Sequence, residues 1–295
     1  MEDILYTLIP VDPSISIPFL LIIIFLISFF GSFIGGITGL GGGMLIKPML
    51  GNILGMASTK ISLYLSKFIS TSVVFSMSAK SANMYRKSGF EYNLKLFLNI
   101  SIGLVIGILS VDLLPIKIPG DVEVLLQGIL YTLVFFSVLL RNKYPKLNYS
   151  DNRFKTILIG LIIGFLSSFF GIGGGAIKVP FFLIFFALPM KQAAIYSFLV
   201  SLVTEPLKLL QYGVHILKFP EIGPDALKVS ILLGLLSVPA AILGAALGVS
   251  IQKKSSDRFI ANSFNAVIIY FAIISIVSGI SMLNGKGPVS IFLIF

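Results

Sequence analysis

The feature that most constrains this chain is a series of apolar runs, each long enough to cross a membrane as a helix. They include residues 14–44, 61–79, 157–189 and 268–283. The hydrocarbon core of a bilayer is about 30 Å thick, and about 20 helical residues span it. With 56% hydrophobic residues and a mean hydropathy of +1.02, the chain cannot be a soluble domain. The runs do not alternate between apolar and polar residues as barrel strands do, so we predict an all-α polytopic membrane protein.

A glycine-rich segment occurs twice in the chain. Residues 39–48 read Gly-Leu-Gly-Gly-Gly-Met-Leu-Ile-Lys-Pro, and residues 171–180 read Gly-Ile-Gly-Gly-Gly-Ala-Ile-Lys-Val-Pro. The copies lie 132 residues apart, and at the same offset Tyr64 falls on Tyr196. A fixed offset of this kind indicates two copies of one structural unit. We assign the repeats to residues 1–140 and 156–295, joined by a basic linker, 141–155, that we expect in the cytoplasm.

The glycine segments predict two broken helices. Four glycines in five residues cannot keep a straight helix in lipid, because glycine weakens the helix and permits conformations that other residues avoid. We expect the first helix to begin near Ile17, to break at the glycines and to resume over about 44–54. The second begins near 156, breaks at 171–175 and resumes to about 187. The full spans are predicted at about 60–80, 93–114, 121–140, 191–215, 226–250 and 259–283.

The distribution of Lys and Arg among the loops distinguishes two topologies. If both broken segments turn back as re-entrant hairpins, the cytoplasmic side holds thirteen Lys and Arg and the other side five. If both cross the membrane, the counts become twelve and six. The positive-inside rule therefore favours the hairpins. A hairpin plus three spans is an odd number of crossings, so the two repeats are predicted to be inverted, an architecture typical of secondary transporters.

Five charged residues fall inside the predicted membrane segments: Lys47, Lys67, Lys178, Lys208 and Glu205. Each buried ion costs about 2.5–3.5 kcal/mol on insertion scales, so a net charge of +3 needs an explanation. Glu205 and Lys208 are three residues apart on one helix and can pair, whereas the other three lysines have no such local partner. An oxyanion held by glycine N–H groups and lysines accounts for the surplus. The alternative is that these lysines extend to an interface and bind no substrate.

The two Gly-x-Gly-Gly-Gly segments are each followed by a proline and then by an amphipathic connection, such as residues 187–194. Over about 15–284, this pattern resembles the sulfite exporter TauE/SafE family, also called the toluene sulfonate uptake permease family. The resemblance implies a secondary transporter in the cell membrane that moves sulfite, sulfonates or related small organic anions without ATP. The family often has a Gly-Thr-Ser triplet after the proline. Here Leu63-Tyr64-Leu65 and Ile195-Tyr196-Ser197 stand in its place, which leaves the identity of the anion open.

The candidate substrate-binding residues are the glycines of both segments, three lysines, two tyrosines and one serine. They are Gly39, Gly41, Gly42, Gly43, Lys47, Tyr64, Lys67, Gly171, Gly173, Gly174, Gly175, Lys178, Tyr196 and Ser197. We expect the anion between the two glycine turns. Packing between helices is an equally good explanation of the two tyrosines. Glu205, the carboxylate placed within a predicted span, is the candidate for proton coupling.

Other classes of function have little support in the sequence. The chain has no cysteine and a single histidine, His215, so we expect no metal site and no cofactor. Neither glycine segment ends in Gly-Lys-Ser/Thr, so there is no P-loop for ATP. An intramembrane enzyme would need a Ser–His dyad, paired aspartates or a metal cluster, so we do not expect an enzyme. A passive anion channel is the nearer alternative. Expected partners are the anion and membrane lipids, without nucleic acid, and oligomerisation stays open.

Overall fold

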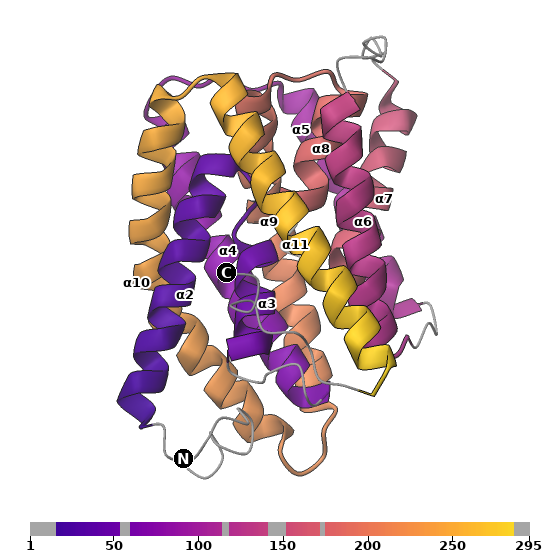
Figure 1. Ribbon diagram of the computed structural model, residues 1–295. Helices are drawn as coiled ribbons and strands as arrows, with labels where there is room; N and C mark the ends of the chain where they lie inside the picture. The colour runs from indigo at the N-terminus through magenta and orange to yellow at the C-terminus, as the bar shows by residue number, and fades with distance from the viewer. Residues whose placement is uncertain (1–15, 54–59, 114–117, 141–151, 172–174, 286–295) are drawn as a thin grey trace.

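The computed structural model describes residues 16–53, 60–113, 118–140, 152–171 and 175–285, and within these ranges every regular element is a helix (Figure 1). The elements are α2 (Ile17–Thr38), α3 (Gly43–Ile53), α4 (Lys60–Arg86), α5 (Leu94–Ser110), the 3₁₀ turn η1 (Val111–Leu113), α6 (Gly120–Leu140), α7 (Arg153–Phe169), α8 (Gly175–Phe185), α9 (Met190–Leu217), α10 (Gly223–Lys254) and α11 (Asp257–Leu283). Seven of these described helices, counting α5 with η1, are long and apolar enough to cross a membrane. The predicted all-α membrane fold is therefore confirmed.

The predicted helix boundaries agree with the structure to within a few residues. The largest difference is at α4, which continues to Arg86 instead of ending near residue 80. Both predicted breaks are present, between α2 and α3 and between α7 and α8. Glycine is required at the break points, because the backbone leaves the helix there in conformations that residues with a Cβ atom rarely adopt. The proposed linker, 141–155, lies mostly outside the described residues.

The first glycine segment is a turn that sends α3 back alongside α2. Gly39, Gly41 and Gly42 have positive φ angles of 79°, 78° and 65°, which residues with a Cβ rarely adopt. A Cβ placed on Gly35 of α2 would lie 2.5 Å from the Gly42 nitrogen, and one on Gly31 would meet the Ile46 side chain at 2.5 Å. The residues of α3 thus lie beside the preceding part of α2. The chain turns back here rather than continuing through the membrane.

The second break also returns the chain toward the end of the bundle from which it came. Helix α7 ends at Phe169, and Gly171 has a φ of 61°. Residues 172–174 lie outside the described ranges, and α8 resumes at Gly175. In Figure 1, α8 and the start of α9 lie at the end of the bundle where α7 begins. Both breaks separate two helices as predicted, and the re-entrant hairpins that the loop charges favour stay a prediction.

The two ends of the bundle differ in charge. Lys191 Nζ donates to the Lys253 carbonyl and Lys253 Nζ to the Met84 carbonyl, so the end of α4, the start of α9 and the α10–α11 junction lie together. We call this the basic end, because the described Lys and Arg near it are Lys80, Arg86, Lys87, Lys95, Arg153, Lys155, Lys191, Lys253, Lys254 and Arg258. At the opposite end the described ones are Lys60, Lys218 and Lys228. The positive-inside rule predicts that the basic end faces the cytoplasm.

Helices from different halves of the chain pack through glycines. Gly244 and Gly248 of α10 meet the backbone of α2, since added Cβ atoms would lie 2.3 Å and 2.2 Å from its Phe29 and Phe33 carbonyl oxygens. On the other side of the bundle, glycines of α5 and α7 face each other in the same way: Gly103, Gly107, Gly160 and Gly164. Association of helices in lipid depends on close backbone approach, because lipid tails are as apolar as leucine. These glycine seams join the two halves.

Cysteine labelling tests the first hairpin, because the chain has no native cysteine. Ser16 precedes α2 and Lys60 begins α4, whereas Lys254 ends α10 at the basic end. We expect single cysteines at Ser16 and Lys60 to react with an impermeant maleimide from the same side of the membrane. A cysteine at Lys254 should react from the other side. Labelling of Ser16→Cys and Lys60→Cys from opposite sides would show that α2 and α3 together cross the membrane.

Candidate functional site

The two glycine segments touch each other inside the protein. A Cβ on Gly175, the first residue of α8, would lie 2.1 Å from the Leu40 carbonyl carbon and 2.5 Å from the Gly39 oxygen. The hydroxyl of Ser197 on α9 donates to that same Gly39 oxygen at 3.2 Å. Two segments 132 residues apart thus meet at backbone contact, which glycine alone permits. Of the other predicted glycines in the second segment, Gly173 and Gly174 lie outside the described residues.

Lys47 and Lys67 share one carboxylate, Glu123. The Nζ atoms of the two lysines lie 3.2 Å and 3.3 Å from Glu123 Oε1. Lys47 Nζ also donates to the Phe170 carbonyl at 2.7 Å. The Lys67 side chain passes over Gly171, where a Cβ would come within 2.7 Å of its Cε. We call Lys47, Lys67 and Glu123 the first lysine cluster. It is built from α3, α4 and α6 and lies against the second glycine turn.

Lys178 and Lys208 share a second carboxylate, Glu205. Their Nζ atoms each lie 3.2 Å from Glu205 Oε1, and all three side chains are buried. Lys178 Nζ also donates to the hydroxyls of Ser201 at 2.8 Å and Thr204 at 2.9 Å. We call Lys178, Glu205 and Lys208 the second lysine cluster. Helix α8 supplies one ammonium and α9 supplies the rest, so each break in a helix delivers a lysine to a carboxylate on a long helix.

Lys47, Lys67 and Lys178, which have no partner on their own helix, have partners on other helices. Lys178 binds Glu205, which the sequence pairs with Lys208 alone, and the other two lysines bind Glu123. Burying an unpaired charge is costly, so the fold brings a carboxylate to each pair of lysines. Counting Glu123, four lysines and two glutamates leave a net charge of +2 instead of +3. Each cluster keeps one ammonium more than its carboxylate can neutralise.

Glu123 is the functional residue that the sequence reasoning missed. It is in the first turn of α6, within a predicted span, and its side chain is only 15% exposed. Its position after Asp121 suggests an ordinary acidic helix start, which is favourable at an N-terminus in any protein. Its position inside the predicted span 121–140 could have identified it, because a carboxylate within a span needs a cation nearby. The sequence predicts Glu205 as the only carboxylate well inside a span, and Glu123, in the first turn of its helix, is a second carboxylate that holds buried lysines.

The predicted tyrosines have different surroundings. The Tyr64 ring stacks on the single histidine, His215, with centroids 5.0 Å apart, and Lys67 Nζ lies 5.7 Å from the Tyr64 centroid. The Tyr196 hydroxyl instead accepts the backbone N–H of Asn93 at 2.7 Å, where α5 begins. Tyr64 is thus beside the first lysine cluster, within the range of a cation–π contact. Tyr196 links α9 to the start of α5, as tyrosines that pack between helices do.

The first turn also uses part of its own hydrogen-bonding capacity. The Gly43 N–H donates to the Gly41 carbonyl at 2.6 Å, and the Leu40 N–H donates to the Thr38 hydroxyl at 3.3 Å. The expected set of anion donors, the N–H groups of residues 41–43, is thereby reduced by Gly43. Any anion at this turn would depend correspondingly more on the lysines.

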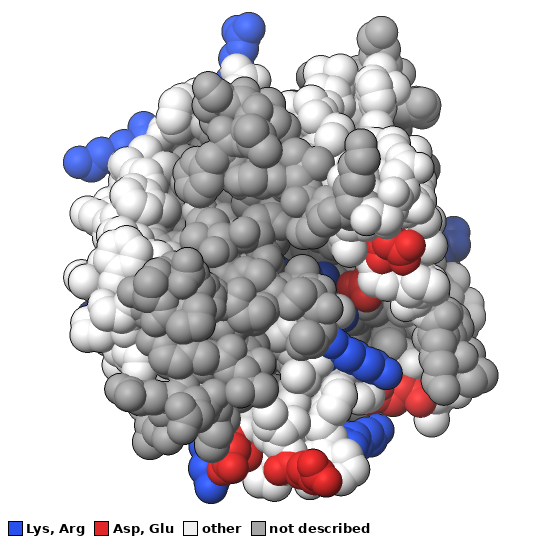
Figure 2. Space-filling view, turned by 60° about the horizontal axis from the view of Figure 1, so that its bottom comes forward, with Lys and Arg blue, Asp and Glu red and all other residues white. Residues whose placement is uncertain are grey.

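A polar network joins the opposite end of the bundle to the first lysine cluster. His215 Nε2 lies 2.9 Å from Asp112 Oδ1, and Gln211 Nε2 donates to Asp112 Oδ2 at 2.9 Å. Ser168 Oγ donates to Gln211 Oε1 at 2.8 Å, and Ser168 is two residues before the carbonyl that accepts from Lys47. Figure 2 brings this end forward and shows acidic and basic atoms together around a hollow. The network connects helices of both halves at this end.

The likeness to known proteins agrees with this construction. The family described as sulfite exporter TauE/SafE matches residues 24–276. The chain belongs to this family. A "Probable membrane transporter protein YunE" of Bacillus subtilis (strain 168) is 29% identical over 132 residues, which make up 45% of this chain and 44% of that protein. No solved structure is significantly similar. The TauE/SafE resemblance and the multi-pass membrane localisation are confirmed, and the family is one of membrane transporters.

The burial of the two carboxylates predicts different effects on stability. Glu205→Gln leaves Lys178 and Lys208 without a counter-charge in a fully buried site, so we expect a loss of about 3–5 kcal/mol, as for a broken buried ion pair. Glu123→Gln should cost less, because the Glu123 side chain retains some exposure. Unfolding of the detergent-purified protein measures both, with the exposed Glu221→Gln as the control. Equal stability of Glu205→Gln and the control would contradict the assigned pairing.

Proposed function

We propose that this TauE/SafE protein is a secondary transporter that carries a small sulfur-containing anion, such as sulfite or a sulfonate, across the cell membrane. The observation that carries the proposal is the charge of the two lysine clusters. Each cluster has two ammonium groups on one carboxylate, and each lies against or near a glycine turn. A bound anion supplies the second negative charge that each cluster lacks. The family supports transport rather than catalysis.

The surplus charge is large enough to matter for binding. Each buried ion costs about 2.5–3.5 kcal/mol on insertion scales, so two uncompensated ammonium groups would weigh on a fold that is stable by only about 5–15 kcal/mol. A dianion, or two monoanions, would remove that surplus. A hydrogen bond from an ammonium to an oxyanion is about twice as strong as a neutral one. The affinity of the site therefore comes from charge that is already buried before the anion arrives.

The packing of the halves supports two inverted repeats as the machinery of transport. At the offset of 132 residues, α2 corresponds to the region of α7, and α5 corresponds to part of α10. Helix α2 packs on α10 and α7 packs on α5, which is the same contact with the halves exchanged. In this arrangement each repeat packs the second of its three full spans, α5 or α10, against the broken segment of the other. In transporters built this way, one repeat moves against the other around a fixed site.

Glu205 stays the leading candidate for coupling to protons, and Glu123 joins it. Both carboxylates hold two ammonium groups, so protonating either one would raise the positive charge of its cluster and strengthen anion binding there. A passive anion channel is the alternative mechanism. Flux that saturates with anion concentration supports a carrier, whereas flux that stays linear supports the channel.

Neutralising a cluster lysine should weaken anion binding. We expect Lys47→Gln and Lys178→Gln to bind sulfite or a simple sulfonate roughly tenfold more weakly, which is about 1.4 kcal/mol and within the range for one charged hydrogen bond. Lys60→Gln is the control, because Lys60 is exposed at the start of α4. Thermal shift or calorimetry at one pH and salt concentration measures the affinities. Equal affinities in all four proteins would place the site elsewhere.

Separating the two glycine turns should stop transport without preventing insertion. In Gly175→Ala the new methyl would meet the Leu40 backbone at 2.1 Å, so the turns must move apart. The matched control is Gly120→Ala, also at the first residue of a helix, where a Cβ meets nothing within 4 Å. We expect anion uptake into proteoliposomes to fall at least about tenfold in the first variant and to stay near wild type in the second. Full uptake by Gly175→Ala would show that the contact is not needed.

A further inference from the structure

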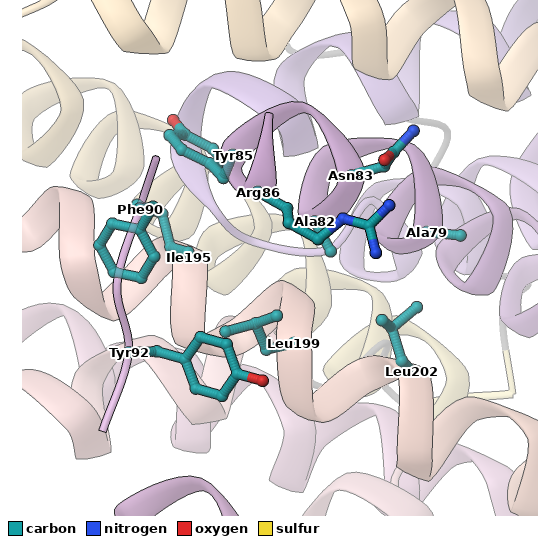
Figure 3. A pocket seen from close by; sticks show the side chains of 10 residues that line it. All are labelled: Ala79, Ala82, Asn83, Tyr85, Arg86, Phe90, Tyr92, Ile195, Leu199 and Leu202. Atoms are coloured by element: carbon teal, nitrogen blue, oxygen red, sulfur yellow. The ribbon is translucent and has the colours of Figure 1, made fainter. Parts of the chain in front are cut away.

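A cavity of about 340 Å³ lies between α4 and α9 at the basic end (Figure 3). Its polar lining includes Arg86, Asn83 and Tyr92, and its apolar lining includes Ile195, Leu199 and Leu202. In Figure 3 the Arg86 side chain extends along α4 past Ala82, and Leu199 and Leu202 lie opposite it on α9. The cavity therefore has charged and hydrogen-bonding groups on one wall and hydrocarbon on the other.

This cavity is distinct from the glycine-turn site. At 3.6 residues per turn, Leu199 and Leu202 lie on a different face of α9 from Ser197, Ser201 and Glu205. The latter three side chains are buried and bind Gly39 or Lys178, whereas Leu199 and Leu202 are only half-buried. Helix α9 itself therefore separates the cavity from the second lysine cluster. The cavity needs an occupant of its own.

Arg86 is a cation available to a ligand. It is exposed, and within the described residues its guanidinium has no hydrogen-bond or ion-pair partner. The neighbouring Lys253 is engaged, because its Nζ donates to the Met84 carbonyl and lies 5.3 Å from the centre of the Tyr85 ring. Tyr85 in turn donates to Gln252, which fixes that wall of the cavity. Side chains of a helix point back toward its N-terminus, and Figure 3 shows the guanidinium beside Ala82 on the way to Ala79.

The position of the cavity indicates the kind of ligand. It lies where α4 ends and α9 begins, two helices long enough to span a membrane, and Tyr92 at its edge is 45% exposed. The ends of membrane-spanning helices are the depth at which we expect lipid headgroups. Amphipathic rings and long cationic side chains are favoured at that depth. Lys and Arg near a membrane surface attract anionic lipids, and the cavity is surrounded by the Lys and Arg of the basic end. A ligand that fits must be anionic at one end and hydrocarbon at the other.

We propose that this cavity binds an anionic phospholipid. The Arg86 guanidinium holds the phosphate, since its planar fork matches phosphate oxygens bidentately. The Tyr92 hydroxyl and the Asn83 amide supply further donors, and the acyl chain follows Leu199 and Leu202. The lipid rests on α4 and α9, the helices that carry Lys67 and Glu205. Its binding consequently stabilises the packing of α4 on α9. Helix α4 contributes Lys67 to the first lysine cluster, and α9 contributes Glu205 to the second.

Lipid titration of the full-length protein in detergent tests the proposal. The probes are phosphatidylglycerol, phosphatidylcholine with the same acyl chains, and inorganic phosphate, and bound lipid is counted by native mass spectrometry with thermal stability as a second readout. We expect phosphatidylglycerol to bind and to raise the melting temperature, phosphatidylcholine to do so roughly tenfold more weakly, and phosphate to have no effect. Arg86→Gln should lose most of that preference, and Lys87→Gln, an exposed neighbouring cation, should keep it.

Three results would overturn the lipid site. Arg86→Gln could retain the preference for phosphatidylglycerol, the two lipids could bind equally to the wild type, or phosphate could protect the protein as well as the lipid does. Tyr92→Phe gives a second measurement if Arg86→Gln does not fold, because it removes one hydroxyl and should weaken phosphatidylglycerol binding a few-fold. Unchanged binding by Tyr92→Phe would then count against the site. Sulfite binding is tested separately with the Lys47 and Lys178 variants, so a failure of the lipid site leaves the proposed transport function standing.

Discussion

The sharing of one carboxylate by two lysines is the interaction on which the interior of this protein depends. Glu123 holds Lys47 and Lys67, and Glu205 holds Lys178 and Lys208. Attraction between such charges grows as the surroundings become less polar, but so does the cost of removing each ion from water. A cluster is stable only where the helices hold its members at hydrogen-bonding distance. The positions of α3, α4, α6, α8 and α9 are therefore linked through these contacts.

The glycine turns make this arrangement geometrically possible. In a straight spanning helix, the lysine would lie among the apolar side chains at the depth of the lipid. The breaks instead place α3 and α8 inside the protein, where the side chains of Lys47 and Lys178 are buried. The contact of Gly175 with Leu40 then places the two glycine segments against each other. One backbone contact, available only to glycine, thus brings two clusters with the same surplus charge into one region.

The charge surplus also connects structure to transport. A fully neutralised interior would have no reason to admit an ion, and a strongly charged one would not fold in lipid. In the proposed transporter, one excess ammonium per cluster is few enough for the protein to fold and enough to favour an anion. This region lies between the two ends of the bundle. The basic end is on one side of it, and the Asp112–His215 network is at the opposite end. In the proposed mechanism, movement of the two halves about the glycine contact exposes this region to each side of the membrane in turn.

Much of this organisation was readable from the sequence because it rests on local patterns. The apolar runs decide that the chain is helical and in a membrane. Apart from a closed barrel, only a helix hydrogen-bonds all of its own backbone N–H and C=O groups in lipid. Four glycines in five residues decide where helices break, and the fixed offset between Tyr64 and Tyr196 predicts two repeats. The family followed from the same segments. Each of these depends on neighbours along the chain or on the solvent, and so it needs no knowledge of distant contacts.

The partners of the charges were decided only by the tertiary structure. Glu123 is 76 residues from Lys47 along the chain, and Asp112 is 103 from His215. Their pairing depends on which helix faces which, and that in turn on the glycine seams and the turn that brings Gly175 to Leu40. Spacing within one helix predicts the contact of Glu205 with Lys208 and nothing beyond it. The sequence by itself determined the membrane, the breaks and the buried cations, and the fold decided which carboxylates neutralise them, because opposite charges in lipid pair by proximity in space.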